Sequence, residues 1–127
     1  MNVNRKSRLI ITRPPFVLSL KKKQENKRSL IGGNIEPNEK PIEAMIREAK
    51  EEASIILSKH DIVLIKEINY TKENTSYQRY YFLLKQPEQY HFTLGEPDKF
   101  EALEWVDFND VSKTFKKADR EVLSKLK

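Results

Sequence analysis

The chain has 127 residues, with 24 Lys and Arg against 19 Asp and Glu, so its formal net charge is +5. A length of this order suits one domain, and we expect a single domain over residues 1–127. The absence of Cys excludes disulfide scaffolds, thiol catalysis and Cys-ligated zinc. Two His are too few for a His-rich metal site. No apolar run of about 18 residues exists, so we expect no membrane span and a cytoplasmic location. Charges of both signs are mixed along the chain, which argues against nucleic-acid binding.

Short apolar segments separated by turn residues predict strands in the first quarter of the chain. Residues 8–12 and 16–20 are such segments, and Pro14-Pro15 separates them. The polar residues 21–28 that follow indicate a hairpin loop or the end of a strand. Gly32-Gly33 then marks a sharp turn or a close approach of the backbone to a ligand.

The apolar periodicity changes to that of a helix over residues 41–57. Pro41 suits the first helical turn, where its missing N–H leaves no hydrogen bond unmade. Apolar side chains recur three and four residues apart, which predicts one buried stripe. The stripe consists of Ile42, Met45, Ile46, Ala49, Ala53 and Ile56.

The second half of the chain predicts three strands and a closing helix. The strands are residues 62–68, 77–84 and 103–108, and an amphipathic helix covers residues 110–126. A long loop over residues 86–99 precedes the last strand, and loops of that length are often functional. The order strand, strand, helix, three strands, helix predicts an α/β fold, of the α+β kind, with a mixed β-sheet covered by helices.

Three glutamates share one face of the first predicted helix. At about 100° per residue, Glu48 and Glu52 lie about 40° apart, and Glu51 lies about 60° further round. Like charges four residues apart repel by about 0.2–0.5 kcal/mol, which a divalent cation would relieve. Carboxylate oxygens are hard ligands that suit Mg²⁺ or Mn²⁺. A solvated surface helix would carry the same residues, so the helix by itself leaves both interpretations open.

The residues before this helix favour a metal site. The pair Gly32-Gly33 lies immediately upstream, and basic side chains gather between residues 21 and 28. Mg²⁺ commonly reaches its site through one or two carboxylates together with substrate phosphates. A glycine pair, basic residues and clustered carboxylates therefore indicate a substrate that contains phosphate.

Residues 33–55 resemble the Nudix box, G-x5-E-x7-R-E-U-x-E-E-x-G-U, in which U is a bulky aliphatic residue. The matching positions are Gly33, Glu39, Arg47, Glu48, Glu51, Glu52 and Ile55, all at the spacing of the motif. Two positions depart from it, since Ala49 stands at the first aliphatic position and Ser54 at the late glycine. A glycine would ease the turn at the helix end, so Ser54 predicts either a longer helix or a strained helix end.

The resemblance implies a Nudix-type α/β/α sandwich that hydrolyses a nucleoside diphosphate linked to a further group, with Mg²⁺ as cofactor or Mn²⁺ as the alternative. The implied metal ligands are Gly33, through its carbonyl, Glu48, Glu51 and Glu52. Catalytic roles would fall to Arg47, Glu48 and Glu51, with Glu48 or another nearby carboxylate activating water. Glu39 would support the site structurally by pairing with Arg47.

Many members of the family add an acidic residue from a loop late in the chain. The candidates here are Glu96, Asp98, Glu101 and Glu104. We predict that Glu101 joins the catalytic residues, because it lies four residues before Trp105, near the end of the long loop. A solvent-exposed glutamate without a role is the alternative.

The further group of the substrate is not evident from the sequence. Size and family likeness favour a nucleoside triphosphate pyrophosphohydrolase that acts on nucleotides, oxidised ones included. Arg13 and Arg28 are candidate phosphate contacts. The alternative function is a non-catalytic Nudix-like module that binds a nucleotide or RNA, against which the intact carboxylates argue. We expect a nucleotide-type small-molecule substrate and a monomer or homodimer.

Overall fold

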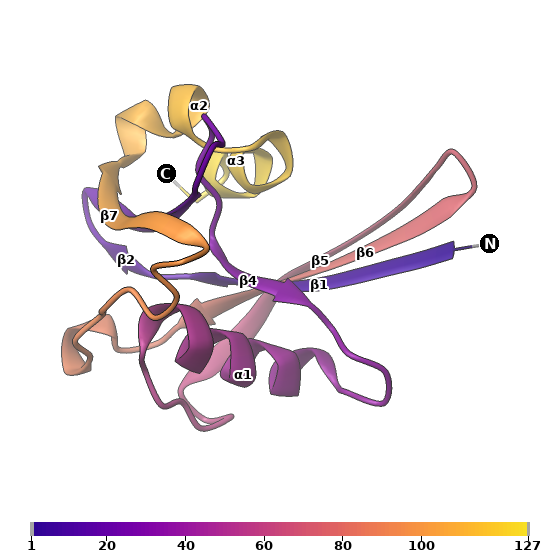
Figure 1. Ribbon diagram of the computed structural model, residues 1–127, viewed down its shortest axis with the longest axis horizontal. Coiled ribbons are helices and arrows are strands. Elements are labelled where there is room, and N and C mark those ends of the chain that lie inside the picture. The colour runs from indigo at the N-terminus through magenta and orange to yellow at the C-terminus, as the bar shows by residue number, and fades with distance from the viewer. Residues whose placement is uncertain (1, 127) are drawn as a thin grey trace.

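Two β-sheets form the centre of the computed structural model, which describes residues 2–126 (Figure 1). The first has the strand order β4-β1-β6-β5. In it β1 and β6 run parallel and the other pairs antiparallel. Its strands are β1 (Asn2–Ile10), β4 (Ile31–Asn34), β5 (Ile62–Lys72) and β6 (Thr75–Leu84). The second is antiparallel, with the order β2-β3-β7, and consists of β2 (Thr12–Arg13), β3 (Phe16–Lys22) and β7 (Phe100–Asp107).

Helices cover the sheets from two sides. Helix α1 (Pro41–Ala53) lies on one side, and α2 (Val111–Thr114) and α3 (Lys117–Ser124) lie on the other (Figure 1). Two short 3-10 turns, η1 (Pro87–Gln89) and η2 (Phe108–Asp110), complete the elements. The predicted α/β/α sandwich with a mixed sheet is thereby confirmed.

The alternation of side chains along β1 explains the two helical layers. Successive residues of a strand point to opposite faces of the sheet. Leu9 packs in a core cluster with Met45 of α1, whereas Ile10 packs with Phe115 and Leu123 on the other side. Each of these side chains is fully buried, and such burial contributes about 1.5–3 kcal/mol per side chain.

Helix α1 ends at Ala53 and not at residue 57 as predicted. Ser54 has φ 59° and ψ 35°, a left-handed conformation that ends the helix. Of the two outcomes that Ser54 predicted, the structure shows the strained helix end. Ile56, predicted in the buried stripe, is 71% exposed because it lies beyond this end.

The predicted terminal helix is divided into α2 and α3 at Phe115. This residue is extended, with φ −92° and ψ 153°, and is fully buried. The extended backbone pairs with a distant segment, because Arg28 N donates to Thr114 O at 2.7 Å and Lys116 N donates to Arg28 O at 2.9 Å. A continuous helix would lose both hydrogen bonds, so a tertiary contact overrides the helical periodicity.

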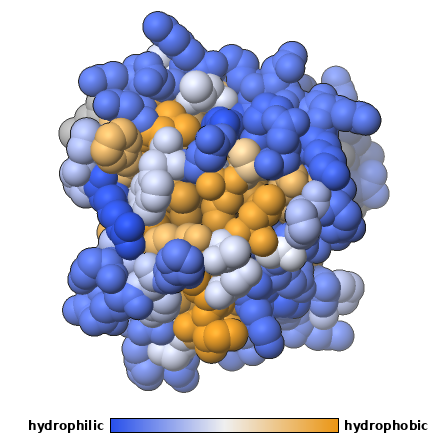
Figure 2. Space-filling model, turned by 60° about the vertical axis from the view of Figure 1, so that its left-hand side comes forward, coloured by the Kyte–Doolittle hydropathy of each residue, from blue (hydrophilic) through white to orange (hydrophobic). Residues whose placement is uncertain are grey.

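The molecular surface is mainly hydrophilic, with one apolar area in view. Figure 2 turns the left-hand side of Figure 1 forward and shows apolar side chains gathered at the centre of that face, surrounded by hydrophilic ones. Further large apolar side chains are exposed on β5, namely Val63, Leu64, Ile65 and Tyr70. Over residues 2–126, no helix has the length and apolar character needed to span a membrane.

Candidate metal and phosphate site

A cavity of about 520 Å³ lies where α1, the edge strand β4 and the loop before β7 meet. Its acidic lining residues are Glu36, Glu48, Glu51, Glu52 and Glu96. Its basic lining residues are Lys6, Arg8, Lys22, Arg47, Lys99 and Lys116. Because β4 is the edge of its sheet, the cavity reaches side chains from both helical layers. A cavity lined by both signs of charge suits a phosphate chain together with its cation.

Gly33 allows β4 to lie close to α1. A Cβ atom at Gly33 would lie 2.8 Å from Glu48 Oε1 and 2.9 Å from Glu48 Cδ. Any other residue would therefore displace the Glu48 carboxylate. Pairing with Ser7 of β1 fixes the backbone of Gly33 in this position.

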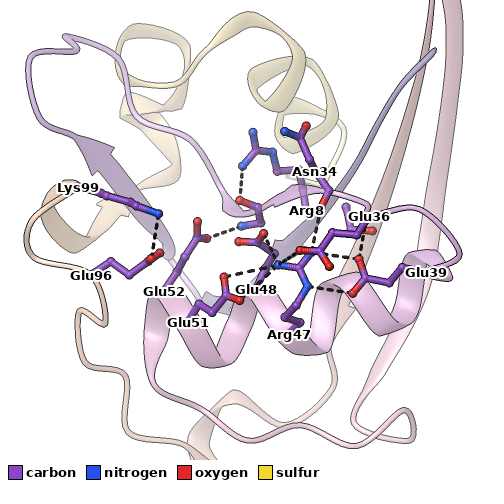
Figure 3. A network of polar contacts seen from close by, with 12 residues as sticks. Arg8, Asn34, Glu36, Glu39, Arg47, Glu48, Glu51, Glu52, Glu96 and Lys99 are labelled. Carbon is purple, nitrogen blue, oxygen red and sulfur yellow. Dashed lines mark hydrogen bonds and ion pairs between the residues drawn. The ribbon is translucent and has the colours of Figure 1, made fainter. Parts of the chain in front are cut away.

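Arg47 is the centre of a polar network that joins α1 to the loop after β4 (Figure 3). Its Nε and Nη2 donate to Glu39 Oε2 and Oε1 at 2.9 and 3.0 Å, a bidentate arrangement. Nη2 also donates to Asn34 O at 3.0 Å. Nη1 donates to Glu48 Oε1 at 2.9 Å and, more weakly, to Glu51 Oε1 at 3.4 Å. The hydrogen bond from Arg47 lowers the pKa of Glu39, so this carboxylate stays ionised and holds the loop on the helix.

Glu52 is the buried carboxylate of the cavity, with 5% of the residue exposed. Its Oε1 accepts a hydrogen bond from Gly32 N at 2.8 Å. Burial raises the pKa of Glu52 to about 8, and the neighbouring Glu48 carboxylate adds to the rise. Without a cation, Glu52 therefore retains a proton at neutral pH.

The donor set fits a hard divalent cation, although the side chains do not converge on one point. Within residues 2–126, no three Asp, Glu or His side chains gather closely enough to hold an ion. Glu48 and Glu51 face Arg47, and Glu52 faces Gly32 N. The side-chain donors are nevertheless all carboxylate oxygens, the ligands that Mg²⁺ and Mn²⁺ prefer. The residues present therefore fit Mg²⁺ or Mn²⁺ by their chemistry.

The loop before β7 brings Glu96 beside the α1 carboxylates. Gly95 N donates to Glu52 O at 3.0 Å, and a Cβ at Gly95 would collide with Glu51 O. Only glycine therefore lets the loop dock on the C-terminal end of α1. Glu96 follows directly, lines the cavity and pairs with Lys99 at 3.2 Å (Figure 3).

Glu101, the loop residue chosen from the sequence, lies elsewhere. It is the second residue of β7, and its side chain is 56% exposed and pairs with Lys21 Nζ at 2.7 Å. The described residues that line the cavity include Glu96 and not Glu101. Distance from Trp105 was the wrong guide, because the loop is anchored on α1 through Gly95. The glycine immediately before Glu96 was the available signal.

Arg13 and Arg28 also lie outside the set of described residues that line the cavity. The Arg13 guanidinium lies over the rings of Trp105 and Phe92, at 5.1 and 5.7 Å from their centroids. Arg28 Nη2 pairs with Glu104 Oε1 at 2.6 Å. Both arginines thus have intramolecular partners in the structure, and their contact with phosphate stays a prediction.

The sequence did not indicate most of the basic residues that line the cavity, apart from Arg47 of the motif and Lys22 in the polar stretch. Lys6 and Arg8 lie two residues apart on β1 and so share a face of the sheet. The predicted strand began at residue 8, which left Lys6 outside it. Lys116 enters the cavity only because the terminal helix is interrupted next to it.

Comparison with known proteins agrees with this geometry. A family model described as the NUDIX domain matches residues 3–126. No sequence among the curated proteins matches the chain significantly.

Several solved structures share the fold over nearly the whole chain. A MutT NUDIX hydrolase from Burkholderia pseudomallei is 22% identical, with a TM-score of 0.79 and coverage of 100% of both chains. The E. coli ORF135 protein is 19% identical, with a TM-score of 0.75 and coverage of 99% of this chain and 89% of that one. The E. coli dihydroneopterin triphosphate pyrophosphohydrolase is 20% identical, with a TM-score of 0.74 and coverage of 95% and 92%. At these identities the likeness shows the fold.

Proposed function

The chain belongs to the Nudix hydrolase family, and from that premise we propose that it is a Mg²⁺-dependent pyrophosphohydrolase of nucleoside triphosphates. Its products would be a nucleoside monophosphate and pyrophosphate. The observation that carries the proposal is the shared cavity, where the α1 carboxylates and a set of lysines line one space. One of the similar structures is a triphosphate pyrophosphohydrolase, which supports this reaction class.

Glu48, Glu51 and Glu52, with the backbone carbonyl of Gly33, would hold the cation, with Mn²⁺ as an alternative to Mg²⁺. When bound, such a cation offsets charge on phosphate oxygens and makes a coordinated water more acidic. The close approach of Gly33 to Glu48 supports this ligand set. Glu52 would release its proton to join it, because a ligating carboxylate must be ionised.

Arg47 would position the reacting carboxylate. Its hydrogen bond engages Glu48 Oε1, so Oε2 is the oxygen that would accept a proton from the attacking water. The bidentate pair with Glu39 fixes the guanidinium and with it this orientation. Glu51 and Glu96, which line the same cavity, are the alternative proton acceptors.

The test is a screen of nucleoside triphosphates, oxidised ones included, for release of pyrophosphate, and of nucleoside diphosphate sugars for release of a nucleoside monophosphate and a sugar phosphate. We expect turnover of at least one triphosphate with Mg²⁺ or Mn²⁺ and none with excess EDTA. Full turnover in EDTA would contradict the metal-dependent mechanism. Tight nucleotide binding without hydrolysis of any substrate would instead favour the non-catalytic binding module.

A further inference from the structure

Three lysines from distant parts of the chain line the same cavity as the carboxylates of α1. Lys6 comes from β1, Lys22 from the end of β3, and Lys116 from the residue before α3. None of the three belongs to the motif in residues 33–55. Their placement is a property of the tertiary structure.

The fold brings this lysine group to the edge of the first sheet. Lys6 lies on the same face of β1 as Ile10, which packs against the α2 and α3 layer. The backbone of Lys116 is held by its hydrogen bond to Arg28 O. The carboxylates belong to α1, in the other layer, and β4 is the edge strand between them. The cavity therefore has an acidic part and a basic part on different structural elements.

The lysine group carries more positive charge than its protein partners neutralise. Lys116 Nζ pairs with Glu25 Oε1 at 2.6 Å. Within residues 2–126, no carboxylate lies within ion-pair distance of Lys6 or Lys22. Burial, with the nearby charges of Arg8 and other cations, lowers the pKa of Lys6 to about 8. An anion in the cavity would relieve this repulsion and keep Lys6 charged.

We propose, on the basis of the proposed function, that Lys6, Lys22 and Lys116 bind the phosphate farthest from the α1 carboxylates. The protein would then be selective for substrates with three or more consecutive phosphates over substrates with two. A two-phosphate chain held at the carboxylates would leave the lysine group without its anion. A third phosphate reaches it and gains hydrogen bonds from ammonium groups, which are stronger than those between neutral groups.

The test compares binding of inorganic tripolyphosphate and pyrophosphate by isothermal titration calorimetry, with Mg²⁺ present and at low ionic strength. The variants are Lys6→Gln with Lys22→Gln, the charge-retaining Lys6→Arg, and Lys59→Gln. Lys59 is an exposed lysine outside the residues that line the cavity, so it controls for the loss of one charge. Melting curves establish that each variant is folded.

We expect the wild-type protein to bind tripolyphosphate more tightly than pyrophosphate. The double variant should lose about tenfold or more in tripolyphosphate affinity and much less in pyrophosphate affinity. Lys6→Arg should retain most of the preference, and Lys59→Gln all of it. In turnover, the double variant should raise KM for a nucleoside triphosphate while leaving KM for a nucleoside diphosphate sugar unchanged.

An unchanged tripolyphosphate affinity in the double variant would overturn the proposal, as would an equal loss for both anions. Hydrolysis of a triphosphate with wild-type KM in that variant would contradict the lysine subsite but would still support the proposed function. If the protein binds tripolyphosphate through these lysines but hydrolyses no nucleotide, the result would support the subsite and contradict the proposed function.

Discussion

The carboxylate of Glu52 on α1 accepts a hydrogen bond from the backbone N–H of Gly32 on β4, at 2.8 Å. The contact joins the last turn of the helix to the edge strand of the sheet, and it is shielded from solvent. Glu52 therefore has a structural bond in the metal-free protein and a proposed place among the metal ligands. Substitutions can separate the two roles, because Gln keeps an acceptor oxygen and removes the charge.

We expect Glu52→Gln to lower turnover by more than about a hundredfold. Changes to residues that only support a metal site already cost about tenfold to a hundredfold, and loss of a ligand should cost more. Its amide oxygen still accepts the hydrogen bond from Gly32 N, so the fold should persist. The metal-free variant should melt at a higher temperature near neutral pH, because glutamine is neutral in both states, whereas Glu52 must take up a proton on folding to avoid a buried charge beside Glu48. Turnover with Mg²⁺ and melting curves with and without Mg²⁺ provide the measurements.

Glu43→Gln is the matched control on the same helix. Glu43 Oε1 accepts from Lys40 N at 2.8 Å at the helix start, and Gln serves equally well at this position of a capping box. We expect little change in turnover and a stability change below about 0.5 kcal/mol. Wild-type turnover in both variants would show that Glu52 has no part in catalysis and would contradict the metal-site assignment.

The raised pKa of Glu52 predicts a pH dependence of stability in EDTA. The folded protein binds this proton up to about pH 8, whereas the unfolded chain releases it near pH 4.3. The contribution of this proton to the free energy of unfolding is therefore complete below the pKa that Glu52 has in the unfolded chain. It is lost as the pH rises through the pKa that Glu52 has in the folded protein. We expect the melting temperature of the wild-type protein to fall between pH 5 and pH 8 more steeply than that of Glu52→Gln.

This pH window isolates Glu52 from the other shifted groups. The carboxylates of Glu39 and Glu101 have lowered pKa values, so their contributions are lost only in more acidic solution. The lowered pKa of Lys6, about 8, affects stability above the window. Parallel curves for the wild-type protein and Glu52→Gln over pH 5–8 would contradict the assignment.

Arg47→Lys should be damaging although it conserves the charge. Lysine cannot reproduce the bidentate contact with Glu39 while also reaching Glu48. We expect a loss of about 1.5–3 kcal/mol in the free energy of unfolding, the range for hydrogen bonds to charged groups. We also expect a fall in kcat, because Glu48 loses its orientation. Urea unfolding and steady-state kinetics measure the two effects. Arg120→Lys on α3 should change neither, and equal behaviour of the two variants would contradict the role given to Arg47.

Ser54→Gly should stabilise the protein or leave its stability unchanged. A left-handed conformation costs a residue with a Cβ about 1–2 kcal/mol, and glycine removes this cost while adding about 0.4–1 kcal/mol of unfolded-state entropy. We expect a gain of up to about 1 kcal/mol in urea unfolding. Mg²⁺ affinity should stay nearly the same, because Ser54 offers the cation no strong ligand. A tenfold loss of Mg²⁺ affinity would show that the residue does more than end the helix.

The sequence by itself determined the features that depend on local spacing. Helical periodicity placed Met45, Ala49 and Ala53 in the core and put Glu48 and Glu52 on the cavity side. This works because a helix fixes the relative directions of residues three and four apart, whatever it packs against. The family resemblance rested on the same spacing, and the match over residues 3–126 confirmed it.

Only the tertiary structure decided which distant residues complete the cavity. Glu96 lines the cavity, and Glu101 is not among its lining residues, because backbone contacts at Gly95 dock the loop on α1. Lys6 and Lys116 joined the cavity through the position of the edge strand and the interruption at Phe115. Strand order, loop docking and helix interruption all depend on hydrogen bonds and packing between segments far apart in the chain, and local periodicity carries no information about those contacts.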